Sequence, residues 1–350
     1  MKQTCKIILP KHTLSQQKGV LLINIGTPNA PTIHAVRNYL REFLADPRVI
    51  DLPSMLRWCF IYGFILPIRA RKIWRAYQTI WTKQGSPLGA NTFRLQQAVQ
   101  VKLGENYYVS VGMSYGVPTI TSALQSLLDR GCKEIMILPL FPQYASASTG
   151  SAIEKVLTYL STKSSIPAIR VFNSFFDNAL FIQAWKVNIN RVFNNSKIDY
   201  LLLSYHGLPL EQLSKVCSNR NCKQIGNCLP LGTSNSGCYR AQCYETSRLL
   251  AVELKLAVKQ YGTAFQSRLG YKKWIQPYLK DVLFKLVKQG VKNIAIATPS
   301  FVSDCLETLD ELGVRAKQEW KELGGDSLYL VPCLNVHPVW VNAVTRMIQS

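Results

Sequence analysis

The stretches LQSLLDRGCKEIMI (Leu124–Ile137) and LFKLVKQGVKNIAI (Leu283–Ile296) decide the fold of this 350-residue chain. They align at a constant offset of 159 residues, which pairs Gly131 with Gly290. Each copy has the pattern of an amphipathic helix, a glycine that ends the helix and a short buried strand. Chance similarity between two βα units of like composition is the alternative interpretation. Taken as a true repeat, the two stretches predict two similar α/β lobes.

Short apolar runs of strand length alternate with helical patterns along the rest of the chain. The runs are 20–25, 107–113, 135–141, 169–172, 200–205, 265–269, 294–297 and 328–331. Such alternation is typical of βαβ units, in which parallel strands are buried on both faces. We therefore predict an α/β fold of two Rossmann-like lobes, each a parallel sheet flanked by helices. The predicted lobes span 18–175 and 176–350, and ligands are expected in the cleft where the strand C-termini face one another.

The composition indicates an anionic partner. Lys and Arg number 41 against 20 Asp and Glu, which gives a formal net charge of +21. Candidate partners are a nucleic acid, an acidic lipid surface or an anionic small molecule. Hydrophobic residues make up 47% of the chain, which argues against a disordered or coiled-coil protein.

Several common motifs are missing. The first strand is followed by Gly26-Thr27-Pro28 instead of G-x-G-x-x-G, and neither G-K-[ST] nor H-E-x-x-H occurs. The missing motifs argue against a nicotinamide dehydrogenase, a P-loop NTPase and a zincin protease. We therefore expect no nucleotide cofactor. Residues 1–17 lack a signal-peptide pattern, and the nearly uncharged run 58–68 is far shorter than the roughly 20 residues that span a bilayer. We expect a soluble protein or one that lies on a membrane surface.

His206 is placed like a reactive group. It is one of only four histidines and stands between the predicted strand 200–205 and a Gly-Leu-Pro turn, so it should lie exposed at the end of a strand. An imidazole there can accept a proton near neutral pH or bind a metal through a neutral nitrogen. A histidine that only caps the strand is the alternative.

A row of acids follows the predicted strand 294–297. Asp304, Glu307 and Glu311 are spaced to share one face of a helix. Such a row is often a solvated face, and acids also favour the first turn of a helix. In a chain with so few acids it is nevertheless a candidate proton path or hard-metal site.

Five blocks of sequence resemble the ferrochelatase family, whose members insert ferrous iron into a porphyrin to make haem. The blocks are INIGTP (23–28), PQYASASTGS (142–151), SYHGLP (204–209), QSR (266–268) with Trp274 and Pro277, and SDCLETL (303–309). They run in the order of the family from about residue 18 to the C-terminus. Five ordered matches are far more specific than one motif. The resemblance implies a chelatase-like fold with the active-site cleft between two lobes.

The resemblance also implies roles for individual residues. His206 matches the histidine of the family, as proton acceptor or iron ligand, and Glu307 matches its glutamate. Asp304 and Glu311 would lie on an acidic metal or proton path behind Glu307. Residues expected to contact the porphyrin are Ile25, Arg71, Tyr77, Ser86, Tyr144 and Trp274. Ile25 stands where some members carry a tyrosine, so no phenolate ligand is expected there.

An acid-free segment carries part of the positive charge. Residues 52–104 contain eight Lys or Arg and no Asp or Glu. The part that we call the lip, 52–81, mixes aromatic residues with Arg and Lys, which suits anionic lipid headgroups or single-stranded nucleic acid. A helix pair whose apolar face is core is a third interpretation. Because this region forms the lip of the pocket in the family, we expect a membrane-facing porphyrin entrance and no nucleic acid.

A cysteine-rich insertion is predicted at 211–241 of the second lobe. It holds Cys217, Cys222, Cys228 and Cys238 in the pattern C-x4-C-x5-C-x9-C, whereas Cys243 falls on a Gln-Cys-x-x-Thr element of the family. Without an export signal, metal ligation is favoured over disulfides. Four thiolates can hold a [2Fe-2S] cluster or a zinc ion, and a loop without metal is the third hypothesis. We predict the [2Fe-2S] cluster, because some ferrochelatases carry one.

These features together predict a lyase that inserts Fe²⁺ into protoporphyrin IX as a step of haem biosynthesis. We expect it in the cytoplasm or peripherally on the inner face of the membrane. A close alternative is a chelatase for coproporphyrin or a cobalt-type ring, although the N-terminal block looks more like bacterial members that use protoporphyrin. A two-lobed protein that binds haem or a metal without catalysis is the alternative from another class. The oligomeric state is not indicated.

Overall fold

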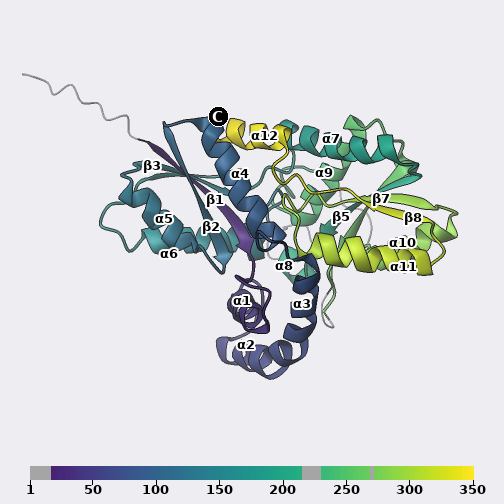
Figure 1. Cartoon of the computed structure of the whole chain (residues 1–350), viewed down its shortest axis with the longest axis horizontal. Coiled ribbons are helices and arrows are strands. Elements are labelled where there is room, and N and C mark those ends of the chain that lie inside the picture. The colour runs from purple at the N-terminus through teal and green to yellow at the C-terminus, as the bar shows by residue number, and fades with distance from the viewer. Residues whose placement is uncertain (1–16, 215–229, 269–271) are drawn as a thin grey trace, which may run out of the picture.

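The computed structural model describes residues 17–214, 230–268 and 272–350 (Figure 1). It contains two four-stranded sheets, and the strands within each sheet are parallel. The first sheet has the order β2-β1-β3-β4, with β1 (Lys18–Gly26), β2 (Tyr107–Tyr115), β3 (Glu134–Pro139) and β4 (Ala168–Val171). The second has the order β6-β5-β7-β8, with β5 (Tyr200–His206), β6 (Tyr261–Gln266), β7 (Asn293–Ala297) and β8 (Ser327–Leu330). The predicted α/β fold with two similar lobes is confirmed.

The two sheets share one register. Ile137 of β3 pairs with Leu21 of β1, and its repeat partner Ile296 of β7 pairs with Leu202 of β5. Counting onward from these pairs, Ile25 occupies in β1 the position that His206 occupies in β5. The repeat therefore extends to strands that the aligned stretches do not include.

The bounds of the observed strands differ from the predicted ones by one or two residues at most ends, and by more in one strand, of which residue 269 lies outside the described residues. The apolar run at 265–269 predicts a strand there, whereas β6 covers Tyr261–Gln266. The ladder with β5 already begins where Tyr261 pairs with Leu201, so the strand includes polar residues that precede the apolar run.

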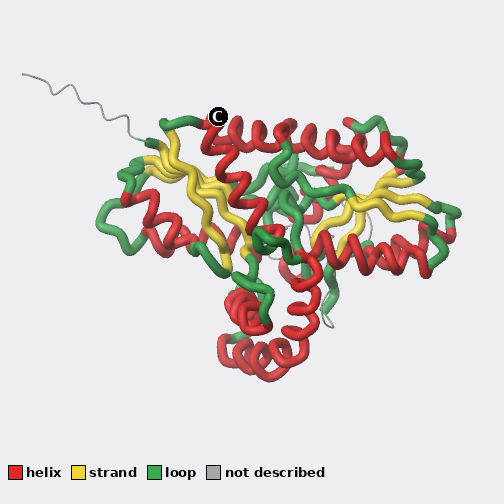
Figure 2. Tube along the Cα trace, in the orientation of Figure 1, coloured by secondary structure: helices red, strands yellow, loops and turns green. Residues whose placement is uncertain are grey.

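Helices cover both faces of each sheet (Figures 1 and 2). The outer faces pack on α5 (Ile120–Asp129) and α6 (Ser151–Leu160) in the first lobe, and on α10 (Leu279–Lys288), the π-helix η5 (Glu307–Ala316) and α11 (Lys317–Glu322) in the second. A single inner core joins both sheets to α4 (Pro87–Leu103), α7 (Ala179–Asn195), α9 (Tyr239–Glu253) and α12 (Pro338–Gln349). Short elements are the π-helix η2 (Ser146–Gly150), α8 (Leu210–Ser214) and the 3₁₀-helix η4 (Val258–Gln260).

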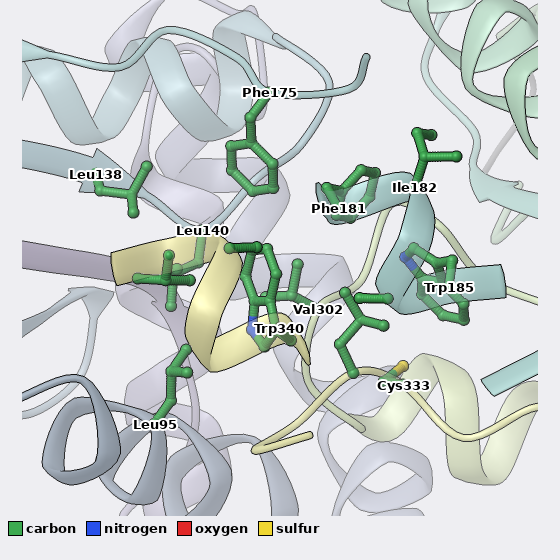
Figure 3. Close-up of a cluster of buried hydrophobic side chains, with 14 of the residues drawn as sticks. Leu95, Leu138, Leu140, Phe175, Phe181, Ile182, Trp185, Val302, Cys333 and Trp340 are labelled. Atoms are coloured by element: carbon green, nitrogen blue, oxygen red, sulfur yellow. The ribbon is translucent and has the colours of Figure 1, made fainter. Parts of the chain in front are cut away.

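The helices α7 and α12 are repeat partners that exchange lobes. Asn178 caps α7, and His337, at the repeat offset, caps α12. Helix α7 follows the first sheet but packs on α9, whereas α12 follows the second sheet but packs on α4. The two helices also pack on each other, with the ring centroids of Phe181 and Trp340 5.9 Å apart (Figure 3). Because this core joins both lobes, the division at residue 175 stays a prediction.

An arm of helices projects from the region where the two lobes meet (Figure 1). It consists of α1 (Ile33–Ala45), α2 (Ser54–Phe60), the π-helix η1 (Ile61–Ile65) and α3 (Leu66–Ile80). The arm has a small core of its own, formed by Val36, Leu40, Leu44, Ile61, Leu66, Ala70 and Tyr77. Helix α3 contacts η5 of the second lobe, so the base of the arm reaches the residues that follow β7.

Candidate active site

His206 is half-buried and ends β5, at the strand end where the sequence pattern predicts it. Its backbone is held on two sides. The His206 N–H donates to Oγ of Ser300 at 3.2 Å, and its carbonyl oxygen accepts from the hydroxyl of Tyr239 at 2.8 Å. Phe301 packs against the imidazole at a steep angle, with the ring centroids 6.2 Å apart. The ring is therefore fixed at the carboxyl end of the second sheet.

Gly207 determines which nitrogen of the imidazole is protonated. Nδ1 of His206 lies 2.7 Å from the carbonyl oxygen of Gly207. Because a carbonyl oxygen can only accept, Nδ1 carries the proton and Nε2 of the neutral ring keeps its lone pair. A Cβ at position 207 would lie 2.7 Å from the carbonyl oxygen of Gln266, so this close approach requires glycine. The site thus offers Nε2 as a proton acceptor or a metal ligand.

Glu307 is the first residue of η5 and lies close to the His206 strand end. Gln266 connects the two, because its carbonyl accepts from the Gly207 N–H at 2.9 Å and its Nε2 donates to the Glu307 carbonyl at 3.4 Å. Burial raises the pKa of Tyr77 on α3, and the charge of Glu307 raises this pKa further. The pKa of the Cys305 thiol is raised by the same two causes. The Glu307 carboxylate therefore faces the base of the arm.

The carboxylates of Asp304 and Glu311 are engaged in hydrogen bonds. Asp304 accepts from the Cys333 N–H at 3.0 Å and from Nδ2 of Asn335 at 2.6 Å. Glu311 accepts from the N–H of Ser267 at 2.9 Å and from its hydroxyl at 2.7 Å. Both acids thus hold loops of the second lobe beside η5.

Three of the expected porphyrin contacts lie at the carboxyl ends of strands or in the loops that follow them. Trp274 is buried and forms an isolated backbone bridge with Pro209, and its ring lies against Gly207. Ile25 is half-buried in β1 at the position equivalent to His206. Tyr144 follows β3 and lines a small pocket that is also formed by residues of α8 and the start of α9. These side chains come from both lobes.

The other expected contacts differ in their surroundings. Tyr77 is buried at the base of the arm. Arg71 is exposed on α3. Ser86 is buried and caps α4, because its Oγ accepts from the Gly89 N–H at 3.1 Å. Its hydroxyl therefore has a structural partner that the sequence alone did not indicate.

A polar contact between the lobes was missed by the sequence reasoning. Nε2 of Gln143 donates to the hydroxyl of Thr246 at 3.0 Å, and Oε1 of Gln242 accepts from the Tyr144 N–H at 2.7 Å. All three side chains are buried. The available signal was the Gln-Cys-x-x-Thr spacing, which places Gln242 and Thr246 on one face of α9. This contact fixes the loop after β3 to the second lobe.

Comparison with known proteins identifies the family. The family model described as Ferrochelatase matches residues 17–350. The chain belongs to the ferrochelatase family. A ferrochelatase of Coxiella burnetii (strain Dugway 5J108-111) is 47% identical over 343 residues, covering 98% of this chain and 95% of the relative. A ferrochelatase of Legionella pneumophila (strain Philadelphia 1) is 48% identical over 334 residues, covering 95% of this chain and 99% of the relative. The predicted enzyme class, a porphyrin metal chelatase, is confirmed.

Solved structures agree with the fold of this ferrochelatase-family chain. The structure of SirB from Bacillus subtilis with Fe³⁺ superposes with a TM-score of 0.54 at 13% identity, over 95% of this chain and 94% of that chain. The sirohydrochlorin chelatase SirB from Bacillus subtilis subspecies spizizenii, in complex with cobalt, gives 0.52 at 12% identity, with the same coverage. At these identities the likeness concerns the fold alone.

Three of the four cysteines predicted to hold a cluster in this ferrochelatase-family chain lie outside the described residues. Cys217, Cys222 and Cys228 fall in 215–229, which the structure does not describe. Cys238 is described, buried, and precedes the first residue of α9. Within 17–214, 230–268 and 272–350, no three His, Cys, Asp or Glu side chains gather as a metal site. The iron-binding role of His206 and Glu307 and the cluster both stay predictions.

The lip presents large apolar side chains to solvent. The exposed fractions are 76% for Met55, 60% for Trp58, 63% for Phe64 and 72% for Ile68. Arg71, Lys72 and Arg75 of α3 are exposed on the same arm. No helix in the described part of the chain is long and apolar enough to cross a bilayer.

Proposed function

We propose that this member of the ferrochelatase family inserts Fe²⁺ into protoporphyrin IX to form protohaem, the terminal step of haem biosynthesis. Membership of the family supports the reaction. The observation that carries the assignment of residues is the contact of the His206 Nδ1 with the Gly207 carbonyl oxygen at 2.7 Å, which leaves Nε2 as the ring nitrogen available to a proton or a metal.

The reaction needs a base and a set of metal ligands. Two pyrrole N–H protons leave the macrocycle for each Fe²⁺ that enters, so two protons must be removed per turnover. Nε2 of His206 accepts a proton or gives its lone pair to the iron, and both roles need the same neutral ring. The Glu307 carboxylate serves as the second proton acceptor or as a ligand of the iron substrate. Asp304 and Glu311 extend this acidic path behind Glu307.

The porphyrin is proposed to lie between the two lobes. Trp274 and Tyr144 would contact the ring from the two sides of the centre, with Ile25 opposite His206. Tyr77, Ser86 and Arg71 would line the entrance at the base of the arm, where a guanidinium suits the porphyrin carboxylates. The preference for protoporphyrin over coproporphyrin or a cobalt-type ring rests on the N-terminal block 21–32.

The decisive experiment mixes the purified protein anaerobically with Fe²⁺ and protoporphyrin IX and follows the conversion of the porphyrin spectrum to that of haem. Folded protein that gives no conversion with either protoporphyrin or coproporphyrin contradicts the proposal. His206→Ala separates catalysis from binding. An enzyme is expected to bind porphyrin without inserting iron after this change, whereas a binding protein would lose affinity in proportion to any activity.

We further propose that the lip docks on an anionic membrane surface, so that the enzyme is cytoplasmic and peripheral on the inner face of the membrane. The exposed apolar residues of α2 and η1 would enter the headgroup region, while exposed arginines and lysines of α3 meet lipid phosphates. An apolar patch on an arm that projects from the body supports this orientation (Figure 1). Nucleic acid is not an expected partner.

Co-flotation with vesicles tests the lip. The protein is expected to float with phosphatidylglycerol vesicles and less with neutral phosphatidylcholine vesicles, and Trp58→Ser with Phe64→Ser should abolish flotation. Val101→Ser with Val258→Ser is the matched control, because these residues are 84% and 86% exposed elsewhere on the surface. Equal loss in both variants, or salt-sensitive retention on DNA in place of vesicle binding, would contradict the proposal.

For the insertion we propose a [2Fe-2S] cluster held by Cys217, Cys222, Cys228 and Cys238. The support is the cysteine spacing and the burial of Cys238 directly before α9. Protein purified without oxygen should absorb visible light at the Fe–S charge-transfer bands. Cys238→Ser is expected to lose this absorption. Cys243→Ser, which removes a buried thiol of α9 that is not among the four proposed ligands, should keep it. A colourless, zinc-containing protein excludes the cluster.

A further inference from the structure

Tyr239 lies directly behind His206 and is not one of the residues to which the reaction assigns a role. It is the first residue of α9, and only 7% of its surface is exposed. Its hydroxyl donates to the carbonyl oxygen of His206 at 2.8 Å. Burial raises the pKa of this phenol well above its ordinary value, so it stays protonated throughout the range in which an imidazole titrates.

The peptide unit between His206 and Gly207 is held at both of its polar groups. Its carbonyl accepts from Tyr239 at 2.8 Å, and its N–H donates to the carbonyl of Gln266 at 2.9 Å. A peptide plane fixed at both ends cannot rotate without losing a buried hydrogen bond. Because the following carbonyl, that of Gly207, binds Nδ1 of the imidazole, rotation of this plane would move the acceptor that sets the protonated nitrogen.

We infer that Tyr239 is a positioning residue that fixes the orientation and protonated nitrogen of the His206 imidazole for metal insertion. The inference rests on the proposed role of His206. The Gly207 N–H still bonds to the Gln266 carbonyl of the neighbouring strand β6, but β5 ends at His206, and on the carbonyl side of this peptide the hydrogen-bond donor is the Tyr239 side chain. Tyr239 therefore holds the side of the peptide plane that the bond to β6 does not hold.

The first lobe lacks this arrangement. Helix α4 occupies the place that α9 occupies in the second lobe, because each precedes the strand that pairs with the central β1 or β5. Helix α4 begins with Pro87, which has no hydroxyl, and Ile25 stands in the place of His206. The tyrosine thus occurs in the lobe that carries the imidazole.

Tyr239→Phe tests the inference, with Tyr205→Phe as the matched control. Tyr205 is also buried, and its hydroxyl lies 2.9 Å from Oγ of Ser247 on the same helix α9. We expect Tyr239→Phe to lower kcat for Fe²⁺ insertion into protoporphyrin IX about tenfold, the factor that corresponds to about 1.4 kcal/mol, with KM within about twofold of the wild type. The Tyr205→Phe enzyme should keep its kcat.

Nitrogen-15 NMR of histidine-labelled protein reads the imidazole directly. The chain has four histidines, so the His206 signal is assigned by its loss in His206→Ala. The wild type and Tyr205→Phe should show a protonated Nδ1 and an unprotonated Nε2, whereas Tyr239→Phe should show a mixture of the two tautomers. This readout does not depend on catalysis and would not move if Tyr239 only stabilised the fold.

Two results would overturn the inference. One is an unchanged kcat and an unchanged imidazole signal in Tyr239→Phe. The other is an equal loss of kcat in Tyr205→Phe and Tyr239→Phe, which would mean that any buried hydroxyl of this core has the same effect. Failure of the proposed function is recognised separately, because the wild type would then form no haem, and failure of the proposed role of His206 is recognised because His206→Ala would still insert iron.

Discussion

The two lobes share the order and register of their strands, yet the residues proposed to accept protons or bind iron lie in only one of them. His206 stands in β5 where Ile25 stands in β1. Both lobes place a π-helix after the third strand of the repeat, and Glu307, which begins η5, corresponds at the repeat offset to Ser148 in η2. The backbone arrangement therefore repeats, whereas the side chains proposed to react do not.

Acidic groups near the strand ends of the first lobe serve structure. Asp46 accepts from the hydroxyl of Tyr115 at 2.8 Å and from that of Ser151 at 2.7 Å, and Glu154 pairs with Arg48. In the second lobe Asp304 and Glu311 are engaged in the same way, whereas Glu307 faces Tyr77 and Cys305. The position of an acid at a strand end thus does not indicate its role. The hydrogen-bond partners of its carboxylate indicate whether that role is structural.

The largest expected effect tests whether the repeat partners α7 and α12 contribute equally to the stability of the core that joins the two lobes. Trp340→Ala and Phe181→Ala each remove a fully buried ring from equivalent positions of α12 and α7. Each change should lower the free energy of unfolding by about 3–5 kcal/mol, because the exchanged helices cannot collapse into the space. Denaturant unfolding measures this. If one of the two substitutions left the free energy of unfolding unchanged, only the other helix would stabilise the shared core.

Activity should distinguish the two π-helices. Glu307→Gln removes the carboxylate charge and is expected to lower iron insertion by at least about a hundredfold. Ser148→Ala changes the corresponding position of the first lobe. Its rate of iron insertion should stay within about twofold of the wild type, because this residue has no part in proton transfer. The anaerobic haem-formation assay measures both. Comparable losses would mean that the first lobe takes part in the chemistry.

Stability should reveal the part played by Asp304. The corresponding residue of the first lobe is Ala145, which makes no such side-chain bonds. Asp304→Ala leaves the Cys333 N–H and the Asn335 amide without their acceptor, so the free energy of unfolding should fall by about 1–3 kcal/mol. Thermal and denaturant unfolding measure the change. Full stability of Asp304→Ala would contradict this structural role, which the carboxylate is expected to combine with its proposed place in the acidic path.

The smallest expected effects concern the pH dependence of stability at the amino ends of the central strands. In the shared register of the two sheets, Asp199 before β5 corresponds to Lys18 of β1. The backbone N–H of Asn293 lowers the pKa of Asp199, and a hydrogen bond to Glu134 raises the pKa of Lys18. The stabilisation from Asp199 is present above its unfolded pKa of about 3.9 and is lost as the pH falls through the folded value. That from Lys18 is present below about 10.4 and is lost as the pH rises through the folded value.

Thermal midpoints measured from pH 3 to 11 test both groups. Asp199→Asn should flatten the loss of stability on the acid side, and Lys18→Met should flatten it on the alkaline side. Each variant serves as the control for the other, because the two groups titrate at opposite ends of the scale. Curves that both follow the wild type would show that neither interaction contributes to the stability of its sheet.

Most of the fold could be predicted because strands, helix stops and the repeat are local patterns. The bounds of β6 were missed, since a parallel ladder can extend over polar residues such as Thr263. The exchange of α7 and α12 could not be predicted, because the lobe on which each helix packs is a long-range contact that no local sequence pattern indicates.

The site could be predicted in part for the same reason. His206 was identified because the end of a strand is a local feature. The partners of Asp304 and Glu311 were not, because Asn335 and Ser267 are brought beside them only by the tertiary fold. Tyr239 follows the cysteine-rich stretch, and nothing in its sequence neighbourhood indicates a contact with His206.

The packing of α12 on α4 has a consequence for how the protein is made. Leu95 and Val99 of α4 share their core with Trp340, but α4 ends at Leu103 and α12 begins only at Pro338. A ribosome must therefore synthesise the whole second lobe before the first can finish burying its inner face. During that interval the face of α4 that packs on α12 has no partner helix.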